Sequence, residues 1–290
     1  MGLIRYAPGW TRQPQGAVAI NPRWARGLRW AASGFGLRDQ ISGREADEGL
    51  TNQQRNYESR SSGIAWTTAL SGSTAYSARP PAWVNGVNID VTTSDFSVLV
   101  VASVVYGADT GPVFCNHGGS NQWRFQANYL ANGTSSGGAS NGALSMLTYD
   151  GSWSTVGAAG VIDGAPHAHL FIRRGTVHEL WVDGRLRASQ TVAVRNVSGG
   201  KTTGLACFWS PSNTPNGDSW YQAAQDFFLG AFWAGAVDPA ISAQPWDLFA
   251  PRQIWAPMSA GAGPSMPTLS LPTVTAIGAT QATPRVTLTY

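Results

Sequence analysis

Histidines are the side chains of this chain best suited to metal chemistry, and three of the four fall in the run 167–186. His167 and His169 are two residues apart, so in a β-strand their rings lie on the same face. That spacing suits two ligands of a metal ion, and His178 could face them across the following turn. The alternative is that these rings pack near the edge of the sheet, and we favour this second interpretation.

A glycan hydrolase needs a pair of carboxylates that face one groove. The acidic residues of the predicted core strands are sparse, mostly single and next to turns. Glu179 and Asp183 are four residues apart, but the end of a hairpin separates them. The sequence therefore predicts a protein that is not an enzyme, and a glycan hydrolase is the least favoured interpretation.

Aromatic residues beside polar loops are the remaining candidates for a binding site. An exposed ring next to polar side chains offers a flat apolar face to a sugar and partners for its hydroxyls. The alternative is that these rings pack in the core or at the rim of a sandwich, where buried aromatics are common. Gly, Ser and Asn surround the four that we select as ligand-binding candidates: Trp153, Trp209, Trp220 and Tyr221.

The elements that would position these residues are strands. The run 167–186 (HAHLFIRRGTVHELWVDGRL) alternates around a turn at Gly175-Thr176 and ends its second strand at Asp183-Gly184. An Asp-Gly pair after an alternating strand indicates a tight hairpin turn, because Gly adopts positive φ at little steric cost. Apolar runs between Gly- and Asn-rich segments predict further strands at 27–31, 96–105, 112–116, 123–129, 143–149, 189–195, 204–209 and 227–234.

The composition agrees with an all-β domain. The chain has 34 Gly, 17 Pro and 13 Trp in 290 residues, and only 12% of its residues are charged. A chain of this length can bury a large core. We therefore expect residues 17–250 to form one two-sheet sandwich with six side chains facing its interior: Val98, Val100, Leu170, Ile172, Trp181 and Phe228.

Two motifs resemble the laminin G-like, concanavalin A-type jelly-roll family. They are LWVDG at 180–184 and LRDQISG at 37–43, which is similar to the L-x-D-x-S-G turn of that family. The resemblance implies a two-sheet antiparallel jelly roll that ends in a short helix near 240–249. It also implies a calcium site at one rim, built from loop oxygens, and no other cofactor. The candidate ligands are Asn116, Asn121, Asp150 and Asp218.

The chain divides into an N-terminal arm (1–16), a jelly-roll domain (17–257), and a linker with a short C-terminal β tail (258–290). In the tail, Val286, Leu288 and Tyr290 alternate with threonines, which is the pattern of a half-buried strand. A tail this short has no core of its own, so we expect these three side chains to be buried against a neighbouring copy or a partner. The stretches 246–255 and 284–290 resemble the C-termini of laminin G-like proteins from tailed-phage and prophage structural gene clusters.

The resemblance predicts a non-enzymatic structural protein of a phage virion, a tail or head appendage. Its partners would be other virion proteins, further copies of itself as a homo-oligomer, and a host glycan. The alternative is a lectin-like carbohydrate-binding module for adsorption to a cell surface.

Net charge, apolar runs and the cysteine count bear on which partners the protein binds and where it assembles. The net charge is only +3 and the arginines are dispersed, so no nucleic acid is expected as a partner. No apolar run approaches the length of a membrane span or a secretory signal, and no membrane partner is expected. Cys115 and Cys207 are too few for a disulfide framework. We therefore expect assembly in the host bacterial cytoplasm and a final location in the virion.

Overall fold

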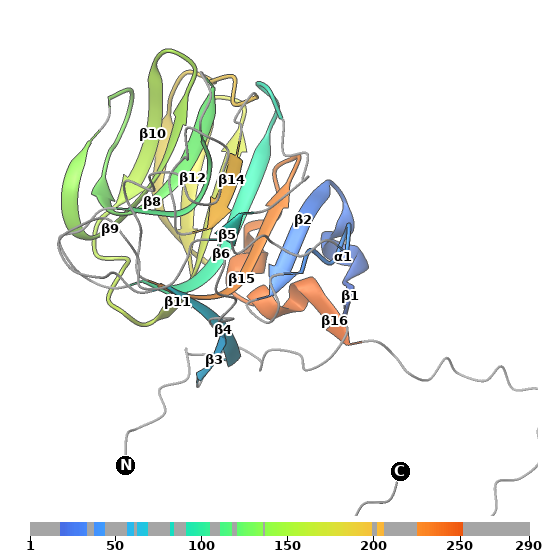
Figure 1. The fold of residues 1–290 in the computed structure, drawn as a ribbon. Helices are drawn as coiled ribbons and strands as arrows, with labels where there is room; N and C mark the ends of the chain where they lie inside the picture. The colour runs from blue at the N-terminus through green and yellow to red at the C-terminus, as the bar shows by residue number, and fades with distance from the viewer. Residues whose placement is uncertain are drawn as a thin grey trace, which may run out of the picture. The chain divides into compact units, whose positions relative to one another are not determined.

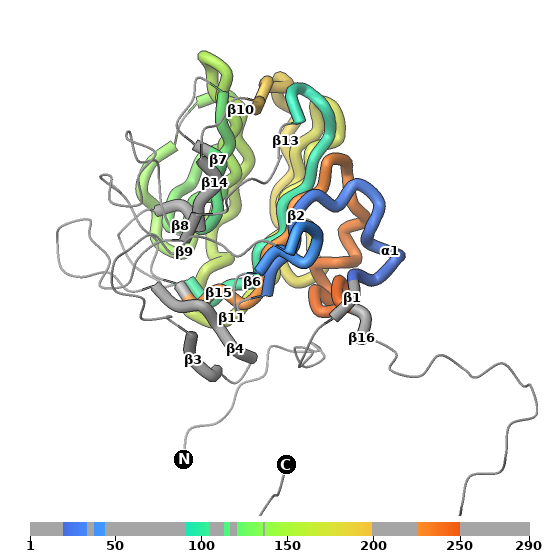
Figure 2. Tube along the Cα trace, turned by 45° about the vertical axis from the view of Figure 1, so that its right-hand side comes forward, coloured from blue at the N-terminus to red at the C-terminus, as the bar shows by residue number. Residues whose placement is uncertain are grey.

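In the computed structural model, the described part of the chain is a sandwich of two antiparallel β-sheets, which confirms the predicted fold class (Figure 1). Figure 2 shows the green strands in one layer and the teal and yellow strands in the other. The structure describes residues 18–33, 38–43, 57–60, 63–68, 82–83, 91–104, 111–117, 121–135, 137–198, 202–205 and 225–251.

The first sheet has the spatial order β10-β9-β8-β7-β14-β5 within the described residues. Its strands are β5 (Ala82–Trp83), β7 (Gly111–His117), β8 (Gln122–Leu130), β9 (Gly138–Tyr149), β10 (Trp153–Ala158) and β14 (Thr202–Leu205). The second sheet has the order β13-β12-β11-β6-β15-β4-β3, and β2 also pairs with β15. Its strands are β2 (Leu28–Ser33), β3 (Tyr57–Arg60), β4 (Gly63–Thr68), β6 (Phe96–Val104), β11 (Pro166–Arg174), β12 (Val177–Val182), β13 (Arg185–Thr191) and β15 (Gln225–Trp233).

Short elements cover the outer side of the second sheet. Figure 2 shows α1 and the orange C-terminal segment beyond that layer. The helix predicted at 240–249 is two short 3-10 turns, because Pro245 begins a new turn instead of continuing the first. None of the helices in the described ranges is long and apolar enough to cross a membrane. The covering elements are β1 (Val18–Ile20), α1 (Pro22–Ala25), η1 (Pro239–Ser242), η2 (Pro245–Leu248) and β16 (Phe249–Pro251).

Both predicted hairpin turns of the run 167–186 are present. Gly175, between β11 and β12, has a φ of 54°. Between β12 and β13, Asp183 and Gly184 have φ values of 50° and 79°, so both are left-handed, as a type I′ turn requires. A Cβ atom on Gly184 would lie 2.7 Å from the Cβ of Ala243, so this turn also needs glycine because it approaches the segment after η1 closely.

Aromatic rings fill the core between the two sheets. The Phe232 ring of the second sheet stacks on Phe96 and on Trp123, with centroids 5.7 Å and 5.8 Å apart. Phe114 meets Trp123 edge to face at 5.2 Å. These contacts join strands of both layers, and such aromatic pairs add stability beyond the area that they bury.

The second sheet is buried on both faces, which corrects the predicted interior. In β6, Val98 and Val100 face the first sheet, whereas Leu99 faces the opposite side. Only Val98 and Val100 of the six selected side chains therefore face the sandwich interior. The other four lie on the opposite face, under α1, η1 and η2: Leu170, Ile172 and Phe228, which are buried, and Trp181, which is partly buried.

The register of β11 against β6 explains this correction. Leu170 lies opposite Leu99, and Phe171 lies opposite Val98. Directly opposed residues share a face of a sheet, so Phe171 faces the first sheet and Leu170 does not. A strand that is apolar on both faces has no alternation to show which face meets the other layer.

Three other expectations can be compared with the structure. Within the predicted turn at 37–43, residues 38–43 are described, and the Asp39 carboxylate accepts hydrogen bonds from the backbone N–H groups of Ala31, Ile41 and Ser42. Strand β9 begins at Gly138 instead of 143, because its first residues pair with the end of β8. The arm, the tail and Cys207 lie outside the described residues.

Candidate functional site

The outer face of the first sheet carries a row of polar side chains along β8. Trp123 and Phe125 belong to the core between the sheets. Successive strand residues point to opposite faces, so Gln122, Arg124 and Gln126 lie on the outer face. These three side chains of β8 are polar although they are partly or fully buried.

An aromatic pair lies beside this row. Gln122 is opposite Tyr149 of β9, and Tyr149 is opposite Trp153 of β10. Because opposed residues share a face, the three side chains form one line across β8, β9 and β10. The centroids of the Tyr149 and Trp153 rings are 4.6 Å apart, and both side chains are partly exposed. We call Gln122, Tyr149 and Trp153 the aromatic row.

Arg124 reaches the aromatic row from the neighbouring position on β8. Its guanidinium carbon lies 4.3 Å from the centroid of the Trp153 ring, which is a cation–π arrangement. Leu147 of β9 lies opposite Arg124 and is fully buried, so the arginine extends across β9 to reach β10. Burial lowers the pKa of Arg124, while Cys115 and Tyr129 act in the opposite direction.

The segment 131–133, which follows β8, packs on the outer face at the far end of β10 from Trp153. Gly133 forms a β-bridge with Thr155, and the Asn132 side chain accepts a hydrogen bond from the N–H of Gly157 at 3.1 Å. A Cβ atom on Gly157 would lie 2.7 Å from the Ala131 carbonyl oxygen, so glycine permits the close approach of the two backbones. These contacts are at the Thr155–Gly157 end of β10, away from Trp153.

Gln122 brings an unpaired acceptor to the aromatic row. Its side chain is 9% exposed, and its Oε1 atom is buried with no hydrogen-bond partner among the described residues. An unpaired buried polar group costs about 1–3 kcal/mol.

The four aromatic candidates chosen from the sequence have different outcomes. Trp153 lies in the aromatic row, whereas Trp209, Trp220 and Tyr221 lie outside the described residues. The sequence interpretation missed Gln122, Arg124 and Tyr149. The alternation of polar and apolar residues in QWRFQAN (122–128) could have indicated a polar outer face, but the partners of that face come from strand register.

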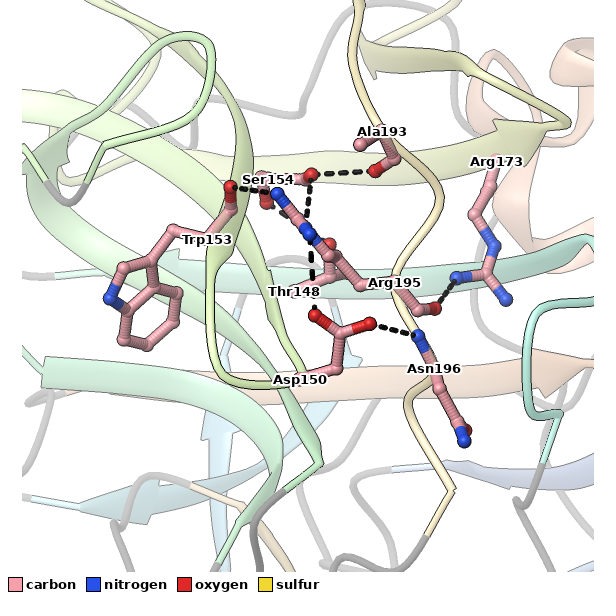
Figure 3. A network of polar contacts seen from close by, with 8 residues as sticks. All are labelled: Thr148, Asp150, Trp153, Ser154, Arg173, Ala193, Arg195 and Asn196. Carbon is pink, nitrogen blue, oxygen red and sulfur yellow. Dashed lines mark hydrogen bonds and ion pairs between the residues drawn. The ribbon is translucent and has the colours of Figure 1, made fainter.

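The predicted calcium ligands do not form a cation site in the described residues. Asp150 accepts hydrogen bonds through both carboxylate oxygens, from the Arg195 side chain at 3.4 Å and from the Asn196 N–H at 3.0 Å (Figure 3). The guanidinium beside Asp150 already balances its charge, so Asp150 does not fit a calcium ligand. Asn116 lies opposite Trp123 and so faces the core, whereas Asn121 precedes β8 and Asp218 lies outside the described residues.

Figure 3 shows that Asp150 belongs to a structural network. Arg195 also donates to the Ser154 hydroxyl at 2.9 Å and to the Trp153 carbonyl at 3.3 Å. From the other sheet, Arg173 donates to the Arg195 carbonyl at 2.7 Å. The network therefore connects the two sheets through the segment that follows β13, and it holds the backbone of Trp153 in place.

The three histidines of the run 167–186 do not converge on one point. His167 lies between two carboxylates, with Nδ1 2.6 Å from Asp183 and Nε2 2.9 Å from Asp163, and these contacts raise its pKa. His169 and His178 are buried on the core side, and desolvation lowers the pKa of each to about 3. His169 and His178 therefore pack inside the core, whereas the favoured interpretation placed the rings near the sheet edge.

Glu179 and Asp183 do not face a common groove. Glu179 accepts a hydrogen bond from the Trp181 indole at 3.0 Å and lies 3.5 Å from Arg174. Asp183 is in the turn after β12, where it contacts His167 and the N–H of Ala168. Both carboxylates therefore have structural contacts.

Solved structures with this fold include several binding domains. Domain 4 of AbnA, a GH43 extracellular arabinanase from Geobacillus stearothermophilus solved in complex with arabinotriose, has a TM-score of 0.51 and 13% identity over 78% of this chain and 98% of that domain. The binding domain of Paraclostridial Mosquitocidal Protein 1 has a TM-score of 0.52 and 10% identity over 76% of this chain and 52% of its own. The Botulinum neurotoxin serotype D binding domain has a TM-score of 0.51 and 11% identity over 79% of this chain and 51% of its own.

The chain spans about half the length of each toxin fragment. No protein-family model and no curated protein matches the sequence. At identities this low, the likeness establishes a β-sandwich of the kind found in carbohydrate-binding and receptor-binding domains, and it does not establish a ligand.

Proposed function

We propose that this protein is a non-enzymatic glycan-binding module and that the aromatic row is its binding face. The observation that carries the proposal is the partly exposed Tyr149–Trp153 pair on the outer face of the first sheet, 4.6 Å apart. A sugar ring has an apolar C–H face that can lie on such a pair. The fold that the chain shares with a domain solved with arabinotriose supports a binding role at the level of architecture.

The polar surroundings of the row suit a sugar better than an apolar ligand. Gln122 and Arg124, both polar, lie next to the aromatic pair on the same face of the sheet. The Arg195 hydrogen bond fixes the backbone of Trp153, and Tyr149 and Arg124 pack against its indole. A ring that is already ordered loses less conformational entropy on binding.

We expect Trp153→Leu to lose glycan affinity by at least about tenfold, because leucine keeps apolar bulk but has no flat face. Binding is measured by isothermal titration against capsular polysaccharides and lipopolysaccharide-derived oligosaccharides selected on an array. The control is Leu186→Ser, which removes an exposed apolar side chain from the edge strand of the other sheet. Equal affinity of Trp153→Leu and the unaltered protein, with both folded by circular dichroism, would refute the assignment.

We further propose that the module acts on a phage particle, as an adsorption or structural appendage protein. This part rests on the resemblance of 246–255 and 284–290 to virion proteins. It gives Val286, Leu288 and Tyr290 the role of an assembly strand that adds to a sheet edge of a neighbouring copy or virion partner.

A chain that ends at Pro257 should remain folded but lose self-association or incorporation into particles. Sedimentation velocity and particle incorporation, each compared with the full chain, test this expectation. Normal assembly of the shortened chain would show that the tail has no docking role.

A further inference from the structure

We infer that Arg195 is the residue that positions the aromatic row, because it joins the two ends of the β9–β10 turn that carry Tyr149 and Trp153. Arg195 thereby controls glycan affinity without touching the glycan. The inference rests on the proposed function and adds a positioning residue to its site. It does not depend on the phage assignment.

The Tyr149–Trp153 pair lies where a sheet is least restrained. Trp153 is the first residue of β10, which is an edge strand of the first sheet within the described residues. Tyr149 is the last residue of β9, and the turn 150–152 connects the two strands. Strand ends and turns open at a low cost in free energy. A pair of rings at this place therefore needs a further restraint to keep its 4.6 Å spacing.

Arg195 supplies that restraint from the segment that follows β13 (Figure 3). Its guanidinium donates to the Trp153 carbonyl at 3.3 Å and, through a second nitrogen, to Asp150 at 3.4 Å. Asp150 directly follows Tyr149, so one side chain holds both ends of the turn. The third nitrogen, Nε, donates to the Ser154 hydroxyl at 2.9 Å. Because the Arg195 and Asp150 side chains are only 18% and 24% exposed, water screens their attraction less than that of a surface ion pair.

The backbone of Arg195 is itself fixed, so its side chain extends from a rigid base. The buried Arg173 of the second sheet donates to the Arg195 carbonyl at 2.7 Å. Two residues later, the Val197 N–H donates to the Thr92 carbonyl at 3.1 Å, and the Val197 side chain is buried in the core. The aromatic pair is therefore anchored to the second sheet as well as to its own.

The role of Arg195 is to position the rings, because all three of its guanidinium nitrogens donate to protein atoms. Its removal should leave both rings in place along the chain but less well ordered. Ordering a side chain on binding costs free energy, and a loosened pair must be ordered each time a glycan binds. We therefore expect Arg195→Met to lower the affinity by about three- to tenfold, which is less than the loss expected for Trp153→Leu.

The test combines the affinity with the motion of the Trp153 ring in the free protein. Isothermal titration uses the oligosaccharide that the array selects. The ¹⁵N relaxation of the Trp153 indole N–H, whose signal is absent from Trp153→Phe, measures how firmly the ring is held. We expect Arg195→Met to lose affinity and to make this indole more mobile before any glycan is added. Arg195→Lys should recover part of both, because an ammonium group lacks the planar set of donors that reaches three acceptors.

The matched control is Ser97→Ala, which removes a buried hydroxyl of the second sheet that donates to the Gly235 carbonyl and accepts from the Val237 N–H. It should lower the midpoint of urea unfolding, as Arg195→Met does, but leave the affinity and the Trp153 indole unchanged.

Three results would overturn the positioning role and leave the glycan-binding proposal standing. They are an unchanged affinity of Arg195→Met, a loss of affinity in Ser97→Ala of the same size, and a loss in Arg195→Met while the Trp153 indole stays rigid. If Trp153→Leu also binds as tightly as the unaltered protein, or if no glycan binds at all, the proposed function itself is wrong.

Discussion

Arg173→Met should lower the free energy of unfolding by about 3–5 kcal/mol, which is the cost typical of removing one partner of a buried charged contact. The Arg173 side chain is fully buried and donates to backbone carbonyls of Thr92, Ser94 and Arg195. Its guanidinium also lies 4.6 Å from the centroid of the Phe96 ring. Methionine fills much of the same volume, so the expected loss comes from carbonyl groups that remain buried without a donor.

Urea unfolding followed by tryptophan fluorescence measures this effect. Arg187→Met provides the control, because Arg187 is exposed on the edge strand β13. It should change the free energy of unfolding by less than about 0.5 kcal/mol. If Arg173→Met changes the stability as little as the control does, the carbonyl contacts do not hold the two segments, 91–95 and 192–198, as the structure indicates.

Acid should destabilise the fold strongly between pH 6.5 and 4.5, before most carboxylates titrate. His169 and His178 have pKa values of about 3 in the folded protein, against 6.5 for an ordinary histidine. The unfolded chain therefore binds more protons than the folded chain below pH 6.5, and stability falls as the pH falls. The loss is on the order of 2.5 kcal/mol for each ring across this interval.

His167 acts in the opposite direction and in a different interval. Its pKa is raised, first by the hydrogen bond with Asp183, so its contribution is complete below pH 6.5 and is lost as the pH rises through its folded value. Stability should therefore have a maximum near neutral pH. His178→Phe, which keeps an aromatic ring beside Phe171, should make the acid decline shallower.

Histidine ring signals in NMR spectra test the same account without unfolding. We expect the rings of His169 and His178 to keep their neutral chemical shifts down to about pH 4.5, while His167 titrates above 6.5. Titration of either buried ring near pH 6.5 would show that it is solvated, and the predicted acid decline would then lack its cause.

The sequence was sufficient for the local structure of this protein. The turns at Gly175 and Asp183-Gly184 follow from positive φ and the residues that tolerate it, and both are present. The apolar runs placed most of the strands, but the strand predicted at 189–195 is β13 at 185–191, and β10 was not predicted. What alternation could not give is the identity of the buried face, because β11 is apolar on both sides, and Leu170 was therefore assigned to the wrong layer.

The candidate site illustrates the same limit. Trp153 was selected because of its polar neighbours in the sequence, and it does lie in the aromatic row. Gln122 and Arg124 are some thirty residues away from it along the chain, and only the register of β8, β9 and β10 brings them together. Asp150 was selected as an oxygen ligand, but its partner Arg195 is forty-five residues distant and could not be inferred from local spacing.

The indole N–H signal of Trp153 during titration with an oligosaccharide that the protein binds on the array tests the glycan-binding face most directly. A ¹⁵N-labelled protein gives one such signal for each tryptophan, and Trp153→Phe identifies the one in question. We predict that the Trp153 signal shifts with ligand concentration until it saturates. The signal of Trp181, whose indole N–H donates a hydrogen bond to Glu179 on the other sheet, should stay unchanged. Saturable binding that leaves the Trp153 signal in place would contradict the aromatic row as the site.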